Sequence, residues 1–431
     1  MRQIAEEVEP SVEFWADRHE RYGPDVPTDS HALNLNAQTP DRPSIHRGDQ
    51  IGSVSPLPIQ SPFNIPARYS CTFHIVFLTI PHSFPDHSPH VSSTRSFMKA
   101  AFLTTQGPPE VIQYGDVPDP QVGEDQVLIR THAMSVNPID TYVRSGVIAA
   151  ELPTPYFPGC DAAGIVEAVG SSVKRFQVGE RVWTTNQGLV GRQGTFAEKI
   201  AVDEKWVFGL PDSVSFEDAA ACALVGITAH LGLFREAQLQ PGESILVIGG
   251  SGGVGSMVVQ MAAATGARVI ATAGSDEKAE KVRAFGAEEV ILYKSQSIAE
   301  QVRQFSERGV NVVWETRREP DFATAVEVMA ERGRMVLMAG RDAQPPFPVG
   351  PFYVKECSLH GFVMFKATPF EMRSAADELS RMMASGKVKA NIGASFPLSE
   401  AAQAHTLQES ATLDQSDRLC GKIIVTSNPS S

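Results

Sequence analysis

The sequence predicts an α/β protein in which β-rich segments flank a doubly wound parallel sheet. Residues 98–225 read as short strands separated by turn residues. From about Gly226, short apolar stretches alternate with helical ones, which is the pattern of βαβ construction. A glycine-rich turn joins the first of these later strands to its helix. The expected architecture is therefore a β-rich part that is interrupted by a parallel sheet with helices on its faces.

The composition is close to the globular average and excludes several other classes of protein. Among 431 residues, 42% are apolar and 20% are charged, which argues against a disordered or coiled-coil chain. The net charge of −13 and the lack of a Lys/Arg run argue against a nucleic-acid partner. No run of 18 apolar residues exists, so we expect no membrane-spanning helix. Five scattered cysteines without C-x-x-C spacing favour a reducing, cytoplasmic setting over a disulfide scaffold.

Residues 1–97 differ in composition and periodicity from the rest of the chain. They hold 12 of the 30 prolines and seven of the 11 histidines but no lysine, and they show neither helical nor strand periodicity. Two interpretations remain open, a disordered extension and a mis-assigned start. The second rests on Met98, which opens the strand-like stretch MKAAFL.

The elements follow in order from there. Before residue 226, alternation predicts strands over 126–135 and 163–169. After it, we expect strands over 244–248 and 268–273, each followed by a helix, over 254–266 and 277–285. Buried strands are expected over 310–314 and 334–338, and the chain ends on a mixed segment that contains the stretch 421–426.

The glycine-rich turn carries the clearest chemical signal. Residues 250–255 read G-S-G-G-V-G, directly after a strand and directly before a helix. We expect Gly252 to permit a tight turn and the close approach of a pyrophosphate, and Gly255 to let helix and strand pack closely. The helix N-terminus points unpaired N–H groups at the phosphates. The motif therefore predicts dinucleotide binding.

The end of the second strand favours NADPH over NADH. An NAD site usually has an acid there, which bonds the ribose 2′-hydroxyl. This chain has Gly274 and Ser275, with Lys278 one helical turn further on, and these suit a 2′-phosphate. Asp276 and Glu277 lie close by and weaken the distinction, and Lys278 has the alternative reading of a solvated helix residue.

Several motifs in a matching order carry a family likeness. Residues 98–426 resemble the zinc-free quinone oxidoreductase branch of the medium-chain dehydrogenase/reductase superfamily, and zeta-crystallin-type enzymes in particular. The motifs are VNPIDTYVRSG (136–146), PGCDAAGIVEAVG (158–170), VGERV (178–182), GTFAE (194–198), the glycine turn and VKECSLHG (354–361). The resemblance implies a GroES-like catalytic domain over 98–225 and 362–431, with a Rossmann NADPH-binding domain inserted over 226–361. It also implies a homodimer or homotetramer.

The resemblance also implies site residues. Asn137, Asp140 and Tyr142 would be catalytic and face the nicotinamide and the substrate, with Asn137 or Tyr142 donating to a quinone oxygen. Asp140 as a helix cap and Tyr142 as core packing stay open as alternatives, and Arg144 is expected in a structural ion pair. The implied cofactor contacts are Tyr142, Ser251, Gly252, Gly253, Val254, Gly255, Gly274, Ser275, Lys278, Tyr293, Gly340, Arg341, Phe362, Val363 and Met364.

Two features bear on metal and substrate. Asn137 and Cys160 stand where zinc-dependent members of the superfamily place their first two ligands, and Cys222 is out of register with the third, so no metal is expected and Cys160 should pack as a small apolar residue. Residues 315–319 read E-T-R-R-E where many relatives have Asp-x-x-Gly, which predicts two extra arginines beside the cleft. The role of Asp321 stays open.

These observations predict an NADPH-dependent oxidoreductase that reduces quinones or other electrophilic α,β-unsaturated carbonyls without a metal. One alternative is an enoyl-thioester or alkenal reductase of the same superfamily. That branch usually has a Tyr directly after the glycine that corresponds to Gly146, where this chain has Val147. The other alternative is a non-enzymatic NADPH-binding sensor or structural protein.

Overall fold

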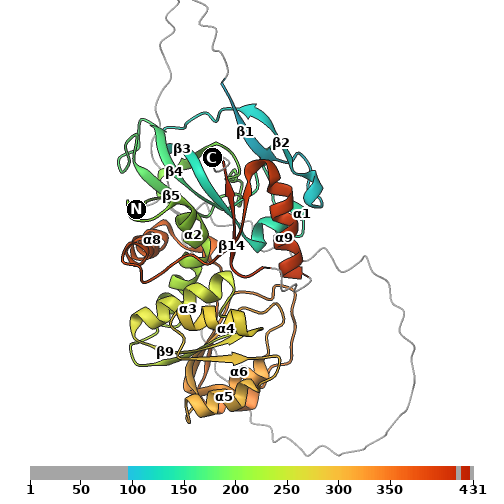
Figure 1. The fold of residues 1–431 in the computed structure, drawn as a ribbon, viewed down its shortest axis with the longest axis vertical. Coiled ribbons are helices and arrows are strands. Elements are labelled where there is room, and N and C mark those ends of the chain that lie inside the picture. Colours follow the sequence, from blue (N-terminus) through green and yellow to red (C-terminus); the bar gives the residue numbers. More distant parts are fainter. Residues whose placement is uncertain (1–95, 414–418, 428–431) are drawn as a thin grey trace, which may run out of the picture. The chain divides into compact units, whose positions relative to one another are not determined.

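The structure, a computed structural model, describes residues 96–413 and 419–427 (Figure 1). The expectations for the first 95 residues lie outside this range. The described residues all belong to one compact unit, Ser88–Ser431. Its first strand, β1 (Phe97–Phe102), covers the predicted MKAAFL stretch and pairs antiparallel with β2 (Gln113–Pro118).

Within the described residues, the β-rich part is a seven-stranded sheet that both halves of the chain build. Its order is β14-β15-β3-β4-β5-β7, and β6 also pairs with β3. The C-terminal strand β15 lies antiparallel to β3, so the tail returns to the sheet that the earlier segment began (Figure 1). The strands are β3 (Gln126–Val136), β4 (Asp161–Val169), β5 (Arg181–Thr184), β6 (Lys199–Asp203), β7 (Val207–Gly209), β14 (Ile392–Pro397) and β15 (Lys422–Thr426).

The second sheet is parallel, with the order β10-β9-β8-β11-β12-β13 over the described strands. This is the doubly wound order, in which the strand order reverses between β8 and β11 and ligands bind at the carboxyl ends. The α/β fold class expected from the sequence is confirmed. The strands are β8 (Ser244–Val247), β9 (Arg268–Ala273), β10 (Glu289–Leu292), β11 (Val310–Glu315), β12 (Met329–Leu337) and β13 (Ser358–Gly361). The domain boundaries at 225 and 361 stay predictions.

Helix starts follow from local capping chemistry. Ser215, Ser275, Ser297 and Thr368 each accept a backbone N–H three residues ahead, which satisfies a donor that the first turn leaves free. The predicted helices over 254–266 and 277–285 are observed one residue earlier. The α-helices are α1 (Pro138–Ser145), α2 (Phe216–His230), α3 (Gly253–Thr265), α4 (Asp276–Ala284), α5 (Ile298–Phe305), α6 (Phe322–Val328), α7 (Val349–Val354), α8 (Pro369–Ala384) and α9 (Ala401–Leu413). The short turns are η2 (Pro109–Val111), η3 (Glu204–Trp206), the π-helical η4 (Leu231–Glu236), η5 (Met364–Lys366) and η6 (Leu398–Glu400).

Helix α2, continued by η4, is the central helix of the fold. Of the described residues, Phe216–Glu236 is the one helix long and apolar enough to cross a membrane, yet 78% of its apolar window is buried inside the protein. It packs against β3, β4, α3 and α8. A side chain on Gly226 would come within 2.6 Å of Leu379 in α8, so the packing there is close. The apolar character of this helix is accounted for by its position in the core.

Helix α1 lies beside α9 (Figure 1), and a partly buried ion pair joins the two helices. Arg144 is completely buried, and its Nη2 lies 2.8 Å from Oε2 of Glu409. The expectation of a structural ion pair for Arg144 is confirmed. His405, also on α9, is fully buried and stacks edge-on with Phe196. Burial, together with the charge of Arg144, lowers the pKa of His405 to about 3.

Because of His405, the protein should become less stable as the pH is lowered. The unfolded chain binds a proton at this histidine below about pH 6.5, whereas the folded chain does so only near pH 3, so acid favours unfolding. We expect wild type to lose about 2 kcal/mol more unfolding free energy between pH 7 and pH 5 than His405→Leu does. Urea unfolding at both pH values measures this difference, and equal losses in the two proteins would contradict it.

Candidate active site

The glycine-rich turn takes its shape from backbone constraints at two glycines. Gly249, after β8, has φ +80°, and its N–H donates to Oγ1 of Thr272 at 2.8 Å. Gly252 has an ordinary φ of −74° and is the N-cap of α3. Its N–H donates to the carbonyl oxygen of Gly249 at 3.0 Å, so Gly252 closes the tight turn, although its own φ does not require glycine. The left-handed residue is Gly249, just outside the motif, because the chain must reverse there to leave the sheet.

Gly255 and Gly252 meet very different surroundings. A Cβ on Gly255 would lie 2.1 Å from the carbonyl oxygen of Gly249, so only glycine allows helix and turn to approach this closely. A Cβ on Gly252 would meet, within 4 Å, the same oxygen alone, at 3.4 Å. The space in front of the helix N-terminus is thus open. An anion such as a pyrophosphate fits a helix N-terminus of this kind.

The predicted adenosine-end residues come together where β9 and β10 end. The N–H of Tyr293 donates to the carbonyl oxygen of Ala273 at 3.3 Å, and a Cβ on Gly274 would lie 3.0 Å from the Tyr293 hydroxyl. Ser275 caps α4 by accepting the N–H of Lys278. Ser275 and Tyr293 are exposed, so this corner can receive a ligand.

Asn137 lies in a buried polar cluster at the start of α1. We call this group the 137 cluster; its members are Asn137, Asp140, Cys160, Asp161 and Lys422. The Nδ2 of Asn137 donates to Oδ2 of Asp161 at 2.8 Å, and its Oδ1 accepts from Nζ of Lys422 at 2.5 Å. Both ends of the amide are therefore bonded inside the protein. The Asn137 side chain is enclosed by these two charged partners, whereas the sequence led us to expect that it faces the nicotinamide and the substrate.

Asp140 caps the helix from inside the same cluster. Its Oδ2 accepts the N–H of Asn137 at 2.7 Å, and its Oδ1 accepts the Cys160 thiol at 2.9 Å. Burial raises the pKa of Asp140 to about 7, and burial also raises the pKa of the Cys160 thiol. The expectation that Cys160 packs only as an apolar residue is wrong, because a buried carboxyl group requires a hydrogen-bond donor.

Asp161 and Lys422 were not singled out from the sequence. The Asp161 carboxylate accepts hydrogen bonds from the hydroxyls of Ser135 at 2.8 Å and Thr185 at 2.6 Å, in addition to the one from Asn137. Lys422 stands alone as a charged residue in the apolar stretch KIIVT of β15. A charged residue in a strand that is otherwise buried is the signal that would have found it, since lysine is rarely buried without partners.

Tyr142 is the half-buried member of the three predicted catalytic residues. Burial raises its pKa, against the opposing effect of the Arg318 and Arg341 charges nearby, so its hydroxyl stays protonated and can donate. Arg341 reaches across to the loop after α1, where its Nη1 donates to the carbonyl oxygen of Val147 at 3.1 Å. The adjacent Gly340 has φ +83°, a left-handed conformation that suits glycine.

The two extra arginines have different surroundings. Arg317 is bonded to the fully buried Glu315, with Nη2 2.6 Å from Oε2. The charge of Arg317 therefore compensates a buried carboxylate, and its place beside the cleft stays a prediction. Arg318 is exposed. Asp321 caps α6 by accepting the N–H and the hydroxyl of Thr324, which gives this residue a structural role.

Three further predicted cofactor residues, Phe362, Val363 and Met364, have different surroundings. Phe362 packs edge-on against Trp314 and lies under the guanidinium of Arg235. Val363 is half exposed, whereas Met364 is buried at the start of η5.

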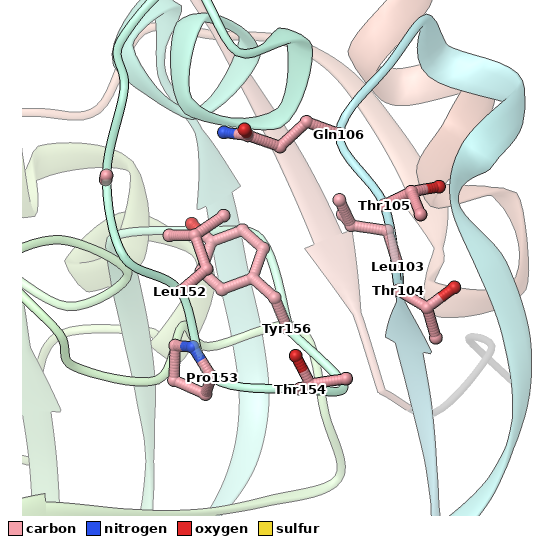
Figure 2. A pocket seen from close by; sticks show the side chains of 9 residues that line it. Leu103, Thr104, Thr105, Gln106, Leu152, Pro153, Thr154 and Tyr156 are labelled. Carbon is pink, nitrogen blue, oxygen red and sulfur yellow. The ribbon is translucent and has the colours of Figure 1, made fainter.

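A cavity of about 190 Å³ lies near α1 (Figure 2). One wall is the segment after β1, and the other is part of the loop after α1. Gln106 in the first wall donates from Nε2 to the carbonyl oxygen of Val143 at 2.7 Å, which ties the cavity to the end of α1. The lining is Leu103, Thr104, Thr105, Gln106, Ala150, Leu152, Pro153, Thr154 and Tyr156.

Comparisons with known proteins agree with this architecture. The family model of the alcohol dehydrogenase GroES-like domain matches residues 123–212, and that of the zinc-binding dehydrogenase matches residues 253–381. The quinone oxidoreductase of Homo sapiens is 32% identical over 317 residues, which are 73% of this chain and 95% of the relative. The chain belongs to the quinone oxidoreductase family.

Solved structures show the same fold. The Escherichia coli quinone oxidoreductase complexed with NADPH has a TM-score of 0.65 and 28% identity, covering 76% of this chain and 99% of that chain. An NAD-dependent alcohol dehydrogenase has a TM-score of 0.70 and 29% identity, covering 77% of this chain and 100% of that chain. The predicted resemblance to the medium-chain quinone oxidoreductases, with a GroES-like and a Rossmann part, is confirmed.

One of the two family models is that of a zinc-binding dehydrogenase. Whether this chain can bind zinc depends on the hydrogen bonds that the side chains of the 137 cluster already make. Catalytic zinc needs three ligands with free lone pairs, usually His, Cys or carboxylate. Asn137 already accepts from the Lys422 ammonium, and the Cys160 thiol donates to Asp140. No group of three or more His, Cys, Asp and Glu side chains suited to a metal occurs in the described part of the chain. The residues of this quinone oxidoreductase homologue therefore do not fit a zinc ion.

The two motif glycines of this family member should respond differently to alanine. Gly255→Ala should lose about 3 kcal/mol of unfolding free energy, because the new methyl group meets a backbone oxygen. Gly252→Ala should keep wild-type stability but weaken dinucleotide binding at least tenfold, because its methyl group enters the open space. Urea unfolding and fluorescence titration with NADPH measure the two effects, and equal behaviour of the two variants would refute this assignment.

Proposed function

We propose that this chain is an NADPH-dependent oxidoreductase that reduces quinones or other electrophilic α,β-unsaturated carbonyls without a metal. The observation that carries the proposal is the open space at the N-terminus of α3. Gly255 packs closely against the turn, and the space beside Gly252 is left open for a pyrophosphate. Membership of the quinone oxidoreductase family supports the reaction type. The donors of the 137 cluster support a reaction that needs no metal.

The residues around the turn suit NADPH. Backbone N–H groups at the start of α3 would bind the pyrophosphate, and Ser275 and Lys278 at the end of β9 would bind the 2′-phosphate. Tyr293 lies against Gly274 at the same corner. When bound, NADPH supplies the reducing equivalents, and the protein supplies position and electrostatics.

Tyr142 is the residue we assign to the substrate oxygen. Its protonated hydroxyl can donate to the negative charge that develops on a quinone or enone oxygen, and a donor of this kind is worth about 3 kcal/mol in favourable cases. Arg318 and Arg341 add positive potential near it. Asn137 and Asp140 hold the start of the helix that carries Tyr142. Without a Lewis acid to polarise it, the acceptor must already be electrophilic.

The assembly we propose is a homodimer or homotetramer in the cytoplasm. Strand β13 ends the described parallel sheet, and an unpaired strand edge is a template for association. Leu359 on this strand and Tyr353 and Val354 on α7 are exposed apolar residues. Such a surface supports contact with a second copy of the chain.

Oxidation of NADPH and NADH at 340 nm tests the proposal on the purified chain, with a simple quinone, an enone and an alcohol/aldehyde pair as substrates. We expect chelator-resistant, NADPH-preferring reduction of the quinone. Lys278→Met should raise the KM for NADPH at least tenfold and change that for NADH less than threefold. Chelator-sensitive alcohol oxidation would overturn the metal-free reaction, and NADPH binding without any turnover would favour a sensor.

Tyr142→Phe removes one hydroxyl group and little else. We expect kcat with the quinone to fall about a hundredfold while the Kd for NADPH stays within twofold, because the donor acts on the substrate oxygen. Steady-state kinetics and fluorescence titration measure the two quantities. Unchanged kcat would remove Tyr142 from the chemistry and favour the core-packing reading of this residue.

A further inference from the structure

Lys422 contacts two parts of the site that are far apart in the sequence. Its Nζ donates to the carbonyl oxygen of Val136 at 2.6 Å and to Oδ1 of Asn137 at 2.5 Å, at the start of α1. Its stem lies against Gly253, where a Cβ would come within 3.2 Å of the Lys422 Cδ. Gly253 is the first residue of α3. One buried side chain thus spans from the glycine-rich turn to the helix that carries Tyr142.

The segment around Lys422 also holds the glycine-rich turn. Asn391 donates from Nδ2 to the carbonyl oxygen of Ser251 at 3.0 Å, and its own carbonyl oxygen accepts the N–H of Lys422 at 2.6 Å. Gly421 has φ +113°, and a Cβ there would lie 2.2 Å from the Asn391 oxygen. This close backbone contact fixes β15 against residue 391. The turn and Lys422 are therefore tied together through the backbone as well as through the stem.

The charges in the 137 cluster orient the Asn137 amide. Its oxygen faces the Lys422 ammonium, and its nitrogen faces the Asp161 carboxylate. Hydrogen bonds to charged groups are stronger than neutral ones, and those in a chain polarise one another. All three side chains are buried, so water does not weaken these bonds. The opposite amide orientation would place an NH₂ group against an ammonium.

We infer that Lys422 is a positioning residue, which fixes Asn137 and the start of α1 relative to the glycine-rich turn. Through α1 it sets Tyr142, and it would thereby set the distance between a bound dinucleotide and the donor for the substrate oxygen. The catalytic part of this inference rests on the proposed function. The structural part, the fixing of α1, does not depend on it.

Lys422→Met removes the ammonium and keeps an unbranched stem. Lys355→Met is the matched control, because Lys355 Nζ also binds backbone carbonyl oxygens, those of residues 326, 327 and 329, but does not contact Asn137. Hydrogen exchange of the protein without cofactor should quicken at least tenfold in residues 137–146 of Lys422→Met. Lys355→Met should keep the wild-type rate there. An unchanged rate in Lys422→Met would overturn the inference.

Kinetics separates positioning from general loss of structure. In Lys422→Met we expect kcat with the quinone to fall at least tenfold, with a Kd for NADPH within threefold of wild type. Equal loss in Lys355→Met would overturn a specific role. If wild type reduces no quinone, the proposed function fails, whereas the hydrogen-exchange result still decides whether Lys422 fixes α1.

The double variant Lys422→Met/Asp161→Asn addresses folding. Lys422→Met leaves the Asp161 carboxylate buried without its cation, and removing one partner of such a pair is strongly destabilising. The double variant removes both charges and should regain thermal stability. We expect its exchange in residues 137–146 to stay fast and its kcat to stay at least tenfold low. Recovery of either value to wild type would show that Lys422 only neutralises Asp161.

Discussion

The buried hydrogen-bond chain from Lys422 through Asn137 to Asp161 is the interaction on which the arrangement of the site depends. It joins the start of α1 and the start of β4, 24 residues apart, to β15, which lies 285 residues beyond Asn137. A buried cation and a buried carboxylate are each costly to remove from water, so they persist only when hydrogen bonds satisfy them. Here Ser135 and Thr185 complete the set around Asp161. The start of α1 is consequently specified by charge and not by apolar packing alone.

The same arrangement explains why this chain, which resembles zinc-dependent dehydrogenases, does not have side chains suited to their metal. Lys422 supplies a fixed positive charge beside Asn137, the position where zinc-dependent members of the superfamily have a ligand. The Cys160 thiol is directed at Asp140, which in turn caps α1. Within the cluster, Lys422 compensates Asp161 through Asn137, and the Cys160 thiol and a backbone N–H satisfy Asp140. The half-buried Tyr142, further along α1, is the group that we propose for the substrate oxygen.

Much of the fold and the position of the glycine-rich turn were predictable from the sequence because local physics determines them. The parallel strands and the helices α3 and α4 follow from apolar periodicity, and the strand–turn–helix motif marks the dinucleotide turn. The roles of Cys160 and Arg317 were not predictable in this way. Each depends on a partner, Asp140 or Glu315, whose burial shows only in the folded chain. Periodicity reports that a position is buried, but it does not report which polar group lies opposite.

By itself the sequence determined the α/β class, the position of the glycine-rich turn and the family likeness, because these depend on residues that are close together in the chain. The tertiary structure alone decided that Asn137 is enclosed between Lys422 and Asp161. The physical reason is distance along the chain. A contact between residues 137 and 422 exists only after β15 has paired with β3, and no local pattern of residues encodes that pairing.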